Sequence, residues 1–562
     1  MITTESPVKL TKNEGLKDGN TVLAGTIAQT LADPAAEKFS EEDYEFLKFH
    51  GIYQQDDRDQ RKVQKHYMLM IRTKFPGGVC SAQQYLVCDK IATEYANNTL
   101  RITTRQDFQF HGIVKSKLHQ TMKSLNEALM STIAACGDVE RNIMAPPTPA
   151  MTPLVDQVLE QARILSDKLA PKTPAYHSIW LDGQALDMNS PQNADFVDPL
   201  YGKRYLPRKF KTAFVIPPLN DIDIFTNDLG FVAIATDGRL EGYNLLAGGG
   251  LGMSHGNPAT FPRLADVIGF LTPEHVETFA KAVLTVHRDF GDRTNRKHAR
   301  LKYVLHERGV EWFRTEVEQR AGMKLQPARP VEFTKQGDVL GWHQQLNGNY
   351  FLGLFVENGR IRDVEGYQLK TALRRVVERF QPEIRLTASQ NILLVNIRPE
   401  HRADIKQLLS EHGVSVHNTF SRTRMASMAC PALPTCGLAL AESERVLPDF
   451  LTGFEKLLEE TGLPNEEVIV RMTGCPNGCA RPYVAEVAFV GKGPNKYQIY
   501  LGGNEPSTRL NRVYKDLVKG EDLLNELRPL LERFRRERKE NERFGDFCHR
   551  VILPEMPVGA GH

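Results

Sequence analysis

TGCPNGCARP (residues 473–482) and ACPALPTC (residues 429–436) carry four cysteines around which we expect the C-terminal part of this chain to fold. One pair has three residues between its cysteines and the other has five, with 38 residues between the pairs. Prolines and a glycine between the cysteines favour loops, and four thiolates held in loops are typical of an iron–sulfur cluster or a tetrahedral metal site. Structural zinc is less favoured, because neither pair has the two-residue spacing of a zinc ribbon. Cysteines that only pack in a core are the other alternative. The four residues are Cys430, Cys436, Cys475 and Cys479.

Composition places the chain among globular proteins with several domains. Its 562 residues are enough for roughly two to four domains. The 71 basic and 69 acidic residues leave a net charge of +2, which gives no support to general nucleic-acid binding. No apolar run is long enough to span a membrane, and the polar N-terminus (MITTESPVKLTKNEG) has no signal-peptide core. Eight cysteines in so long a chain predict a reducing, cytoplasmic setting, with Cys80, Cys88, Cys136 and Cys548 as ordinary isolated thiols.

A strand–helix–strand pattern occurs twice along the chain. YMLMIRTKF, SAQQYLVCDKIATEYA and LRITTRQDFQFHGI (within 67–113) predict a strand, a helix and a second strand. NYFLGLFVENGRI, YQLKTALRRVVERF and EIRLTASQNILLVNI (within 349–397) repeat this order. RITTRQ (101–106) aligns with RLTASQ (385–390), and the matching spacing argues for an internal duplication over a chance likeness of two α+β units.

These patterns predict an α+β fold with three domains around a central cofactor site, one of them built from two pseudo-symmetric duplicated halves. The linker-like APPTPAMTP precedes a central domain in which FKTAFVIPP, DLGFVAIAT and LEGYNLLAGGGLG predict strands. The polar N-terminal segment predicts an extended arm that could dock a partner. The expected bounds are 1–65 for the arm, 66–145 and 333–419 for the two halves, 146–332 for the central domain, and 420–562 for the cysteine-bearing domain.

Basic residues form the second candidate constellation. If LRITTRQDFQFHGI is one strand, its even spacing places several polar side chains on one face. Such a face is costly to bury without an anionic partner, so it indicates a polyanionic ligand, whereas a solvated face with surface ion pairs is the alternative. Lys209 and Lys211 in LPRKFKT share a face in the same way. The residues on the first strand are Arg101, Arg105, Gln109 and His111.

Glycines crowd the stretch LLAGGGLGMSHGN (245–257), where Gly248, Gly249 and Gly250 are consecutive. Such a loop lets the backbone approach a flat or phosphorylated ligand closely. It does not match the phosphate-binding or dinucleotide fingerprints, and no flavin or nicotinamide motif occurs elsewhere. The chain therefore has no site of its own where NADPH electrons would enter.

RITTRQDFQFHGI, LPRKFKT, AGGGL, the C-x5-C pair and TGCPNGC resemble the siroheme-dependent sulfite and nitrite reductases over essentially the whole chain. YQQDDRD (53–59) and ERFGDF (542–547) resemble the hemoprotein (beta) subunit of the NADPH-linked assimilatory enzymes. The resemblance implies a 4Fe–4S cluster on the four cysteines and a siroheme whose iron shares the sulfur of Cys479. Siroheme carries eight carboxylates, which would be satisfied by arginine and lysine.

The resemblance also implies roles for individual residues. Four of them would receive the substrate anion on the distal face of the siroheme and act in catalysis: Arg72, Arg141, Lys209 and Lys211. Ten would contact the cofactors: Arg101, Arg105, Gln109, His111, Arg208, Gly248, Gly249, Gly250, Lys302 and Asn477.

The function implied by the resemblance is the six-electron reduction of sulfite to sulfide. Electrons would come from NADPH through a separate diflavin subunit, with no nucleic-acid or membrane partner. A siroheme nitrite reductase is the alternative within the same class. A non-catalytic iron–sulfur or zinc protein, whose cysteines are purely structural, is the alternative outside it.

Overall fold

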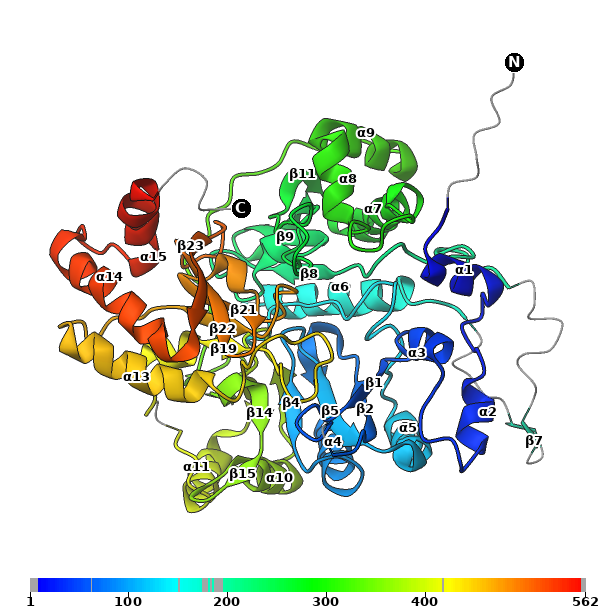
Figure 1. Cartoon of the computed structure of the whole chain (residues 1–562), viewed down its shortest axis with the longest axis horizontal. Coiled ribbons are helices and arrows are strands. Elements are labelled where there is room, and N and C mark those ends of the chain that lie inside the picture. Colours follow the sequence, from blue (N-terminus) through cyan, green and yellow to red (C-terminus); the bar gives the residue numbers. More distant parts are fainter. Residues whose placement is uncertain are drawn as a thin grey trace.

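The computed structural model describes residues 9–61, 63–149, 152–173, 180–181, 184–185, 196–416 and 419–556. The first eight residues of the predicted arm lie outside the described residues. Helices and strands are mixed along the chain, which confirms the predicted α+β class (Figure 1). Within the described part of the chain, no helix is both long and apolar enough to cross a bilayer.

The duplicated halves form two five-stranded sheets with the same strand order. The first sheet runs β1-β2-β5-β4-β14 and the second runs β12-β13-β18-β17-β3. Each half therefore contributes one short strand, β14 or β3, to the edge of the other half's sheet. The first sheet consists of β1 (Ile52–Asp56), β2 (Tyr67–Arg72), β4 (Leu100–Ile102), β5 (Phe108–Ile113) and β14 (Arg360–Ile361). The second consists of β3 (Val79–Cys80), β12 (Gly341–Gln344), β13 (Tyr350–Leu354), β17 (Glu383–Leu386) and β18 (Ile392–Ile397).

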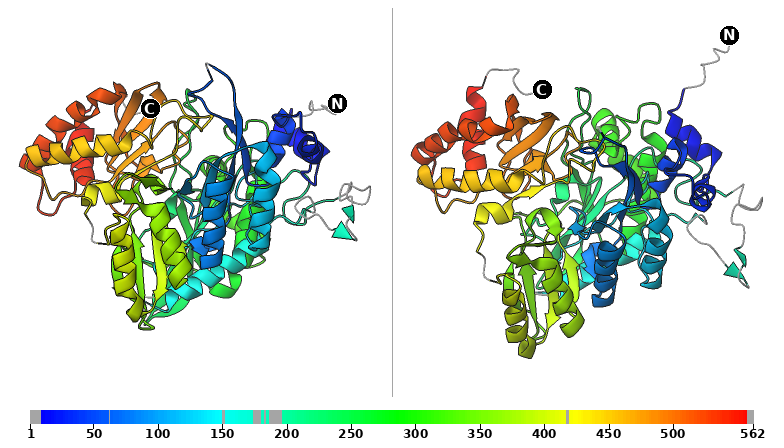
Figure 2. Two further views of the ribbon diagram at one scale, coloured as in Figure 1. Left: turned by 90° about the horizontal axis from the view of Figure 1, so that it is seen from below. Right: turned by 60° about the horizontal axis from the view of Figure 1, so that its bottom comes forward.

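Helices of both halves lie together against these sheets (Figure 2) and share one apolar core. Helix α4 begins at a capping box, in which the Ser81 hydroxyl accepts from the Gln84 amide and the Gln84 side chain accepts from the Ser81 amide. Its counterpart α10 packs against it. The helices are α4 (Ala82–Glu94), α5 (Leu118–Glu127), α10 (Leu369–Phe380) and α11 (Arg402–Glu411), with a small ribbon of β15 (Asp363–Val364) and β16 (Tyr367–Gln368) before α10.

One predicted strand is in fact a hairpin. LRITTRQDFQFHGI forms β4 and β5, which pair antiparallel with Arg101 opposite Gln109. The connecting turn is closed by the Thr103 amide, which donates to Asp107 O at 2.8 Å, and Gln106 adopts a left-handed φ of 59°. The single-strand prediction is wrong because this turn contains no glycine or proline to mark it.

The central part of the chain packs helices against a four-stranded sheet of order β11-β10-β9-β8. β8 runs parallel to β9, and the other pairs are antiparallel. The three predicted strands are confirmed as β8, β9 and β10. The elements are α6 (Leu154–Lys168), a ribbon of β6 (Trp180–Leu181) and β7 (Gln184–Ala185), β8 (Thr212–Val215), β9 (Leu229–Thr236), β10 (Arg239–Ala247), β11 (Asp266–Leu271), α7 (Val276–Phe290), α8 (Leu301–Arg308) and α9 (Val310–Ala321).

The C-terminal part forms a third core around the sheet β19-β20-β21-β22-β23. The amphipathic helices α13 and α14 bury their leucine faces against it, and the charged face of α14 is solvated as its sequence predicts. The elements are α12 (Arg422–Ala426), β19 (Met428–Ala429), α13 (Leu447–Glu460), β20 (Val470–Thr473), β21 (Val487–Gly493), β22 (Lys496–Leu501), β23 (Arg512–Lys519), α14 (Leu523–Glu537) and α15 (Phe544–Phe547).

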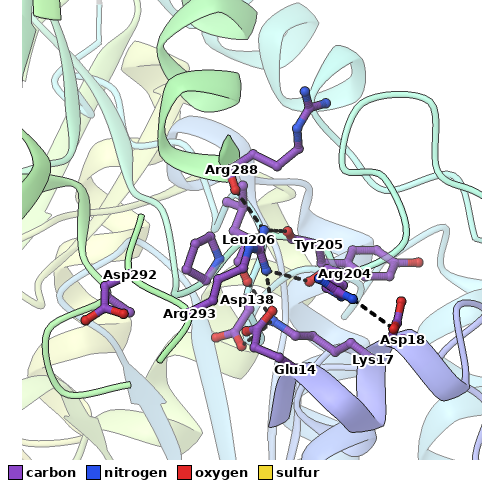
Figure 3. Close-up of polar contacts among 12 residues, drawn as sticks. Glu14, Lys17, Asp18, Asp138, Arg204, Tyr205, Leu206, Arg288, Asp292 and Arg293 are labelled. Atoms are coloured by element: carbon purple, nitrogen blue, oxygen red, sulfur yellow. Dashed lines mark hydrogen bonds and ion pairs between the residues drawn. The ribbon is translucent and has the colours of Figure 1, made fainter. Parts of the chain in front are cut away.

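The N-terminal segment is folded onto the body from residue 9 onward, which corrects the prediction of an extended arm. Helix α1 carries a buried ion pair, Lys17–Glu14, whose two members bond to the body (Figure 3). Lys17 donates to Glu14 at 2.6 Å and to Leu206 O at 2.8 Å. Arg293 donates to Glu14 and, at 2.7 Å, to Tyr205 O. Burial of these charges is offset by their mutual ion pair and by contacts with the body. The elements are α1 (Lys12–Gly19), α2 (Ile27–Ala32) and α3 (Glu41–Leu47), followed by β1.

Candidate functional site

The two cysteine loops begin at the same edge of the C-terminal sheet. β19 and β20 are parallel neighbours, with Ala429 opposite Met472. Because the carboxyl ends of parallel strands lie at one edge, the loops that follow them meet there. The Gly474 amide donates to Cys430 Sγ at 3.4 Å, and the Asn477 side chain donates to Cys475 Sγ at 3.6 Å. The Asn477 side chain thus contacts one of the four thiols, and its contact with a cofactor stays a prediction.

The four thiols are neighbours. Cys430 and Cys475 are buried, Cys436 is half-buried and Cys479 is exposed. Burial, followed by the proximity of Cys479, raises the pKa of Cys475 to about 12 and also raises the pKa of Cys430 and of Cys436. Mutually repelling thiolates need a cationic centre to be stable together.

The spacing of these thiols bears on the kind of centre they would hold. No three His, Cys, Asp or Glu side chains of the described ranges converge so as to hold a single metal ion. Zinc requires all of its sulfurs at about 2.3 Å from one point, whereas cluster thiolates bind different irons. Thiols that do not converge on one point are compatible with an iron–sulfur cluster.

A row of polar side chains crosses the first sheet. Arg72 lies opposite Gln109, and Gln109 lies opposite Arg101. Directly opposed residues share a face, so the hairpin brings together three of the predicted site residues. With its amide oxygen turned toward Arg72, Gln109 accepts at 3.1 and 2.5 Å. His111 lies two residues along β5, and both of its ring nitrogens are buried without a partner among the described residues.

Arg105 does not lie on this strand face, which corrects the even-spacing argument. It sits in the hairpin turn and reaches into the central domain, where it donates to Asn142 O at 2.6 Å and Thr212 O at 3.0 Å. Its Nε is buried and has no partner among the described residues. Burial lowers the pKa of Arg105 to about 10.

Two predicted cofactor contacts are engaged within the protein. Arg101 donates to Glu444 at 3.0 Å and to Ala429 O at 2.9 Å, which ties the first sheet to the loop of Cys430. Lys302 donates to the carbonyls of Gly250 at 3.1 Å, of Gly252 at 2.8 Å and of Phe261. Lys302 thereby holds the shape of the glycine-rich loop, and contact of either residue with a cofactor stays a prediction.

The glycine-rich loop packs on the second cysteine loop. Met253 N donates to Pro476 O at 2.9 Å, and a Cβ at Gly252 would lie 3.3 Å from Asn477 O. A Cβ at Gly249 would lie 2.2 Å from Phe225 O, so that position requires glycine. The glycines allow close approach between protein segments, and their contact with a ligand stays a prediction.

An excess of positive charge gathers beside Cys479. Arg72 and Arg141 both donate to Ala135 O, at 3.5 and 3.1 Å. Both Arg72 and Lys209 lie within electrostatic reach of the Cys479 thiol. Three cations of this region make no side-chain hydrogen bond or ion pair with the described residues, although they are only half-exposed: Arg208, Lys209 and Lys211.

Burial and the neighbouring positive charges lower the pKa of both lysines. Burial, then Arg208 and Arg300, lowers the pKa of Lys209 to about 7. Burial, then Arg105 and Lys209, lowers the pKa of Lys211 well below its ordinary value. Unpaired, crowded cations are costly, so the chain's own residues leave a site suited to a polyanion. The unpartnered atoms of His111 and Arg105 fit the same conclusion.

Several residues of the site have no signal in the sequence. The Asp228 carboxylate accepts hydrogen bonds from Arg300 at 2.8 Å and from the Lys211 amide at 3.0 Å. The Glu444 carboxylate accepts hydrogen bonds from both Arg101 and Arg360. Acidic residues of this kind are ordinary in sequence, and only their contacts reveal them.

Comparison with known proteins assigns the chain to a family. The sequence model described as the nitrite and sulphite reductase 4Fe-4S domain matches residues 160–325 and 421–555. The nitrite/sulfite reductase ferredoxin-like half domain matches residues 60–128 and 343–412, which confirms the predicted duplication.

Similar curated proteins are named sulfite reductase (NADPH) hemoprotein beta-component. That of Oceanobacillus iheyensis is 46% identical over 96% of this chain and 94% of its own length. That of Geobacillus thermodenitrificans is 46% identical over 97% and 96%, and that of Myxococcus xanthus is 46% identical over 97% of each. The solved structure of the Mycobacterium tuberculosis NirA protein has the same fold, with a TM-score of 0.78, 24% identity and 96% of each chain covered. The chain therefore belongs to the nitrite and sulfite reductase family.

Proposed function

We propose that this chain is the hemoprotein component of an NADPH-dependent sulfite reductase and reduces sulfite to sulfide. The reaction takes up six electrons and releases the three oxygens as water. The names of its curated relatives support this activity. The observation that carries the proposal is the set of unpaired cations beside the exposed thiol of Cys479. A small oxyanion bound there would supply the missing negative charge.

The residues present fit the two redox groups that the family resemblance implies. Cys430, Cys436, Cys475 and Cys479 would hold the 4Fe–4S cluster, and Cys479 would also bind the siroheme iron. The carboxylates of siroheme would be satisfied by Arg208, Arg105, Gln109 and His111. When bound, siroheme and the cluster supply the one-electron redox chemistry that the side chains of the chain lack.

The chain's own residues would bind the anion and supply protons. Arg72 and Arg141 are held by Ala135 O and present fixed positive charge. The ammonium groups of Lys209 and Lys211 make no hydrogen bond or ion pair with the described residues. The pKa of Lys209 lies at about 7. A general acid works best when its pKa is near the working pH. These lysines are therefore the proposed proton donors as each oxygen leaves.

Electrons would come from a partner. No flavin or nicotinamide motif occurs in the sequence, and the relatives are named as beta-components of an NADPH enzyme. We infer that a separate diflavin subunit oxidises NADPH and delivers electrons to this chain.

Nitrite reduction is the second candidate, because the matching family includes nitrite reductases. The test is to purify the chain, record its optical spectrum, and compare turnover of sulfite and nitrite with reduced methyl viologen. Siroheme bands together with efficient reduction of sulfite to sulfide support the proposal. Turnover of nitrite alone would favour the second candidate, and a spectrum without heme bands would contradict both.

A further inference from the structure

Arg481 follows the predicted shared ligand Cys479 by two residues and is only 7% exposed. Its guanidinium reaches three separate parts of the fold. Nη1 donates to Thr104 O at 3.1 Å, Nη2 donates to Ala388 O at 2.9 Å, and Nε donates to Asp223. Its backbone adopts a left-handed φ of 51°, which a non-glycine residue rarely does, and its carbonyl accepts from Arg471 at 3.0 Å.

The two carbonyl partners of Arg481 are equivalent positions of the duplication. Thr104 occupies the same place in RITTRQ (101–106) as Ala388 occupies in RLTASQ (385–390). The first turn also reaches the second half directly, because the Gln106 side chain donates to Leu386 O at 3.0 Å. Arg481 therefore lies between the two halves, on the approximate two-fold axis that relates them.

The symmetry is broken at the next contact. The Thr104 hydroxyl donates to the carbonyl oxygen of Cys479 at 3.0 Å. The equivalent Ala388 has no hydroxyl, so the second half cannot make this bond. The Cys479 loop is thus centred between the halves by Arg481 and tied to the first half by Thr104. The first half also carries Arg72, one of the cations beside the Cys479 thiol.

We propose that Arg481 and Thr104 are positioning residues that fix the Cys479 thiol between the cluster side and the cation side of the site. This inference rests on the proposed role of Cys479 as a shared ligand. Thr104 holds the carbonyl of Cys479, and Arg481 fixes the same loop at three acceptors. These bonds restrict the directions in which the Cys479 thiol can point. Such preorganisation is the condition for a ligand that must serve two groups at once.

The first test removes only the hydroxyl bond. Thr104→Val is nearly isosteric, Thr104→Ser restores the donor, and Thr371→Val is the matched control, because its hydroxyl bonds Asp363 on an exposed surface. In the full-length protein with its cofactors, we expect Thr104→Val to retain iron and siroheme. Its spectroscopic signature of siroheme–cluster coupling should shift, and kcat for sulfite should fall by about tenfold, the scale of one hydrogen bond, with little change in KM. Thr104→Ser and Thr371→Val should resemble the wild type.

The second test addresses Arg481. A lysine cannot reach three acceptors in a fixed fork, so Arg481→Lys should lower the content of siroheme and of cluster iron together. Unaltered content and an unaltered coupling signature in Arg481→Lys would overturn the proposal. So would an unaltered Thr104→Val, or equal impairment of Thr104→Val and Thr104→Ser.

A third measurement separates this inference from the proposed function. In the cofactor-free full-length chain, the rate of Cys479 alkylation by iodoacetamide can be followed by peptide mass spectrometry. We expect Thr104→Val to change this rate at least several-fold and Thr104→Ser to restore it. If the wild type lacks heme bands but the alkylation rates behave in this way, the proposed function fails and the positioning role stands. Unchanged alkylation in Thr104→Val overturns the positioning role even in a working sulfite reductase.

Discussion

Replacing Lys209 or Lys211 by methionine tests whether the unpaired cations act on the substrate. Both lysines flank Phe210 just before β8, and neither forms a hydrogen bond or ion pair through its side chain with the described residues. Each variant therefore removes a charge without breaking a protein contact, and methionine preserves much of the side-chain length. We expect both variants to fold and to bind their cofactors normally.

The expected loss follows from the electrostatics of the site. Two unit charges about 4 Å apart at an effective dielectric constant of about 20 interact with about 4 kcal/mol, and a positioned acid contributes about 10²- to 10⁴-fold. The other cations remain and the lysines are only half-buried, so the loss in kcat/KM for sulfite should be roughly 10²-fold or more in each variant.

The two losses should not be independent. The charge of Lys209 is one cause of the lowered pKa of Lys211. Removing Lys209 therefore raises the pKa of Lys211 and makes it a more fully charged substitute. We expect the double variant to lose more activity than the product of the two single losses.

The assay is steady-state sulfite reduction with reduced methyl viologen, with siroheme occupancy measured from the optical spectrum of each variant. Lys203→Met is the control, because Lys203 is exposed and lies in the same segment. Partly reduced sulfur products should accumulate in the two active-site variants. If Lys209→Met and Lys211→Met both keep wild-type rates at full occupancy, the lysines have no catalytic role and the reasoning from their unpaired charges is wrong.

Four further outcomes are expected. Cys479→Ser should abolish sulfite turnover and disturb both the heme bands and the iron content; retention of all three would refute its role as a shared ligand. The chain alone should not oxidise NADPH but should turn over with reduced methyl viologen, and a diflavin subunit should restore NADPH-driven activity. Deleting residues 1–65 should lower the melting temperature, since it removes the buried Phe46 and the strand β1, whereas a docking role can be tested by deleting residues 1–8 and measuring coupling to the flavoprotein. Burial raises the pKa of Glu444, but its arginine partners outweigh burial and hold it at about 2, so its stabilising effect is present above about pH 4.5 and is lost as the pH falls toward 2. Glu444→Gln should therefore be less stable than wild type in urea at pH 6, and the gap should narrow between pH 4.5 and pH 3; a constant gap would contradict this pKa.

Local signals in the sequence were sufficient for the cysteine motifs, the duplicated strand–helix–strand order and the central strands. Strand and helix periodicities are properties of short segments, and a duplication preserves spacing. The hairpin between β4 and β5 was missed because its turn depends on Thr103 and Gln106, neither of which is a strong turn signal. The folded N-terminal segment was missed because the contacts that hold it to the body are long-range. Lys17 bonds to Leu206 O and Glu14 bonds to Arg293, and neither partner can be recognised from the sequence.

By itself, the sequence determined which chemistry the chain carries: four thiols in loops, a surplus of arginine and lysine in particular motifs, and two related halves. These depend on residue type and spacing, which are written along the chain. Only the tertiary structure showed that Arg72 and Gln109 lie directly opposite each other on neighbouring strands. The row of Arg72 and Gln109 in the first sheet corresponds to Gly353 and Leu393 in the second, as the matching strand registers show. The tertiary structure also showed that each half contributes a strand to the sheet of the other half. It further showed that Arg481 bonds to equivalent turns of both halves. Such contacts join residues hundreds of positions apart, and their partners are defined only once the long-range packing places them within hydrogen-bonding distance.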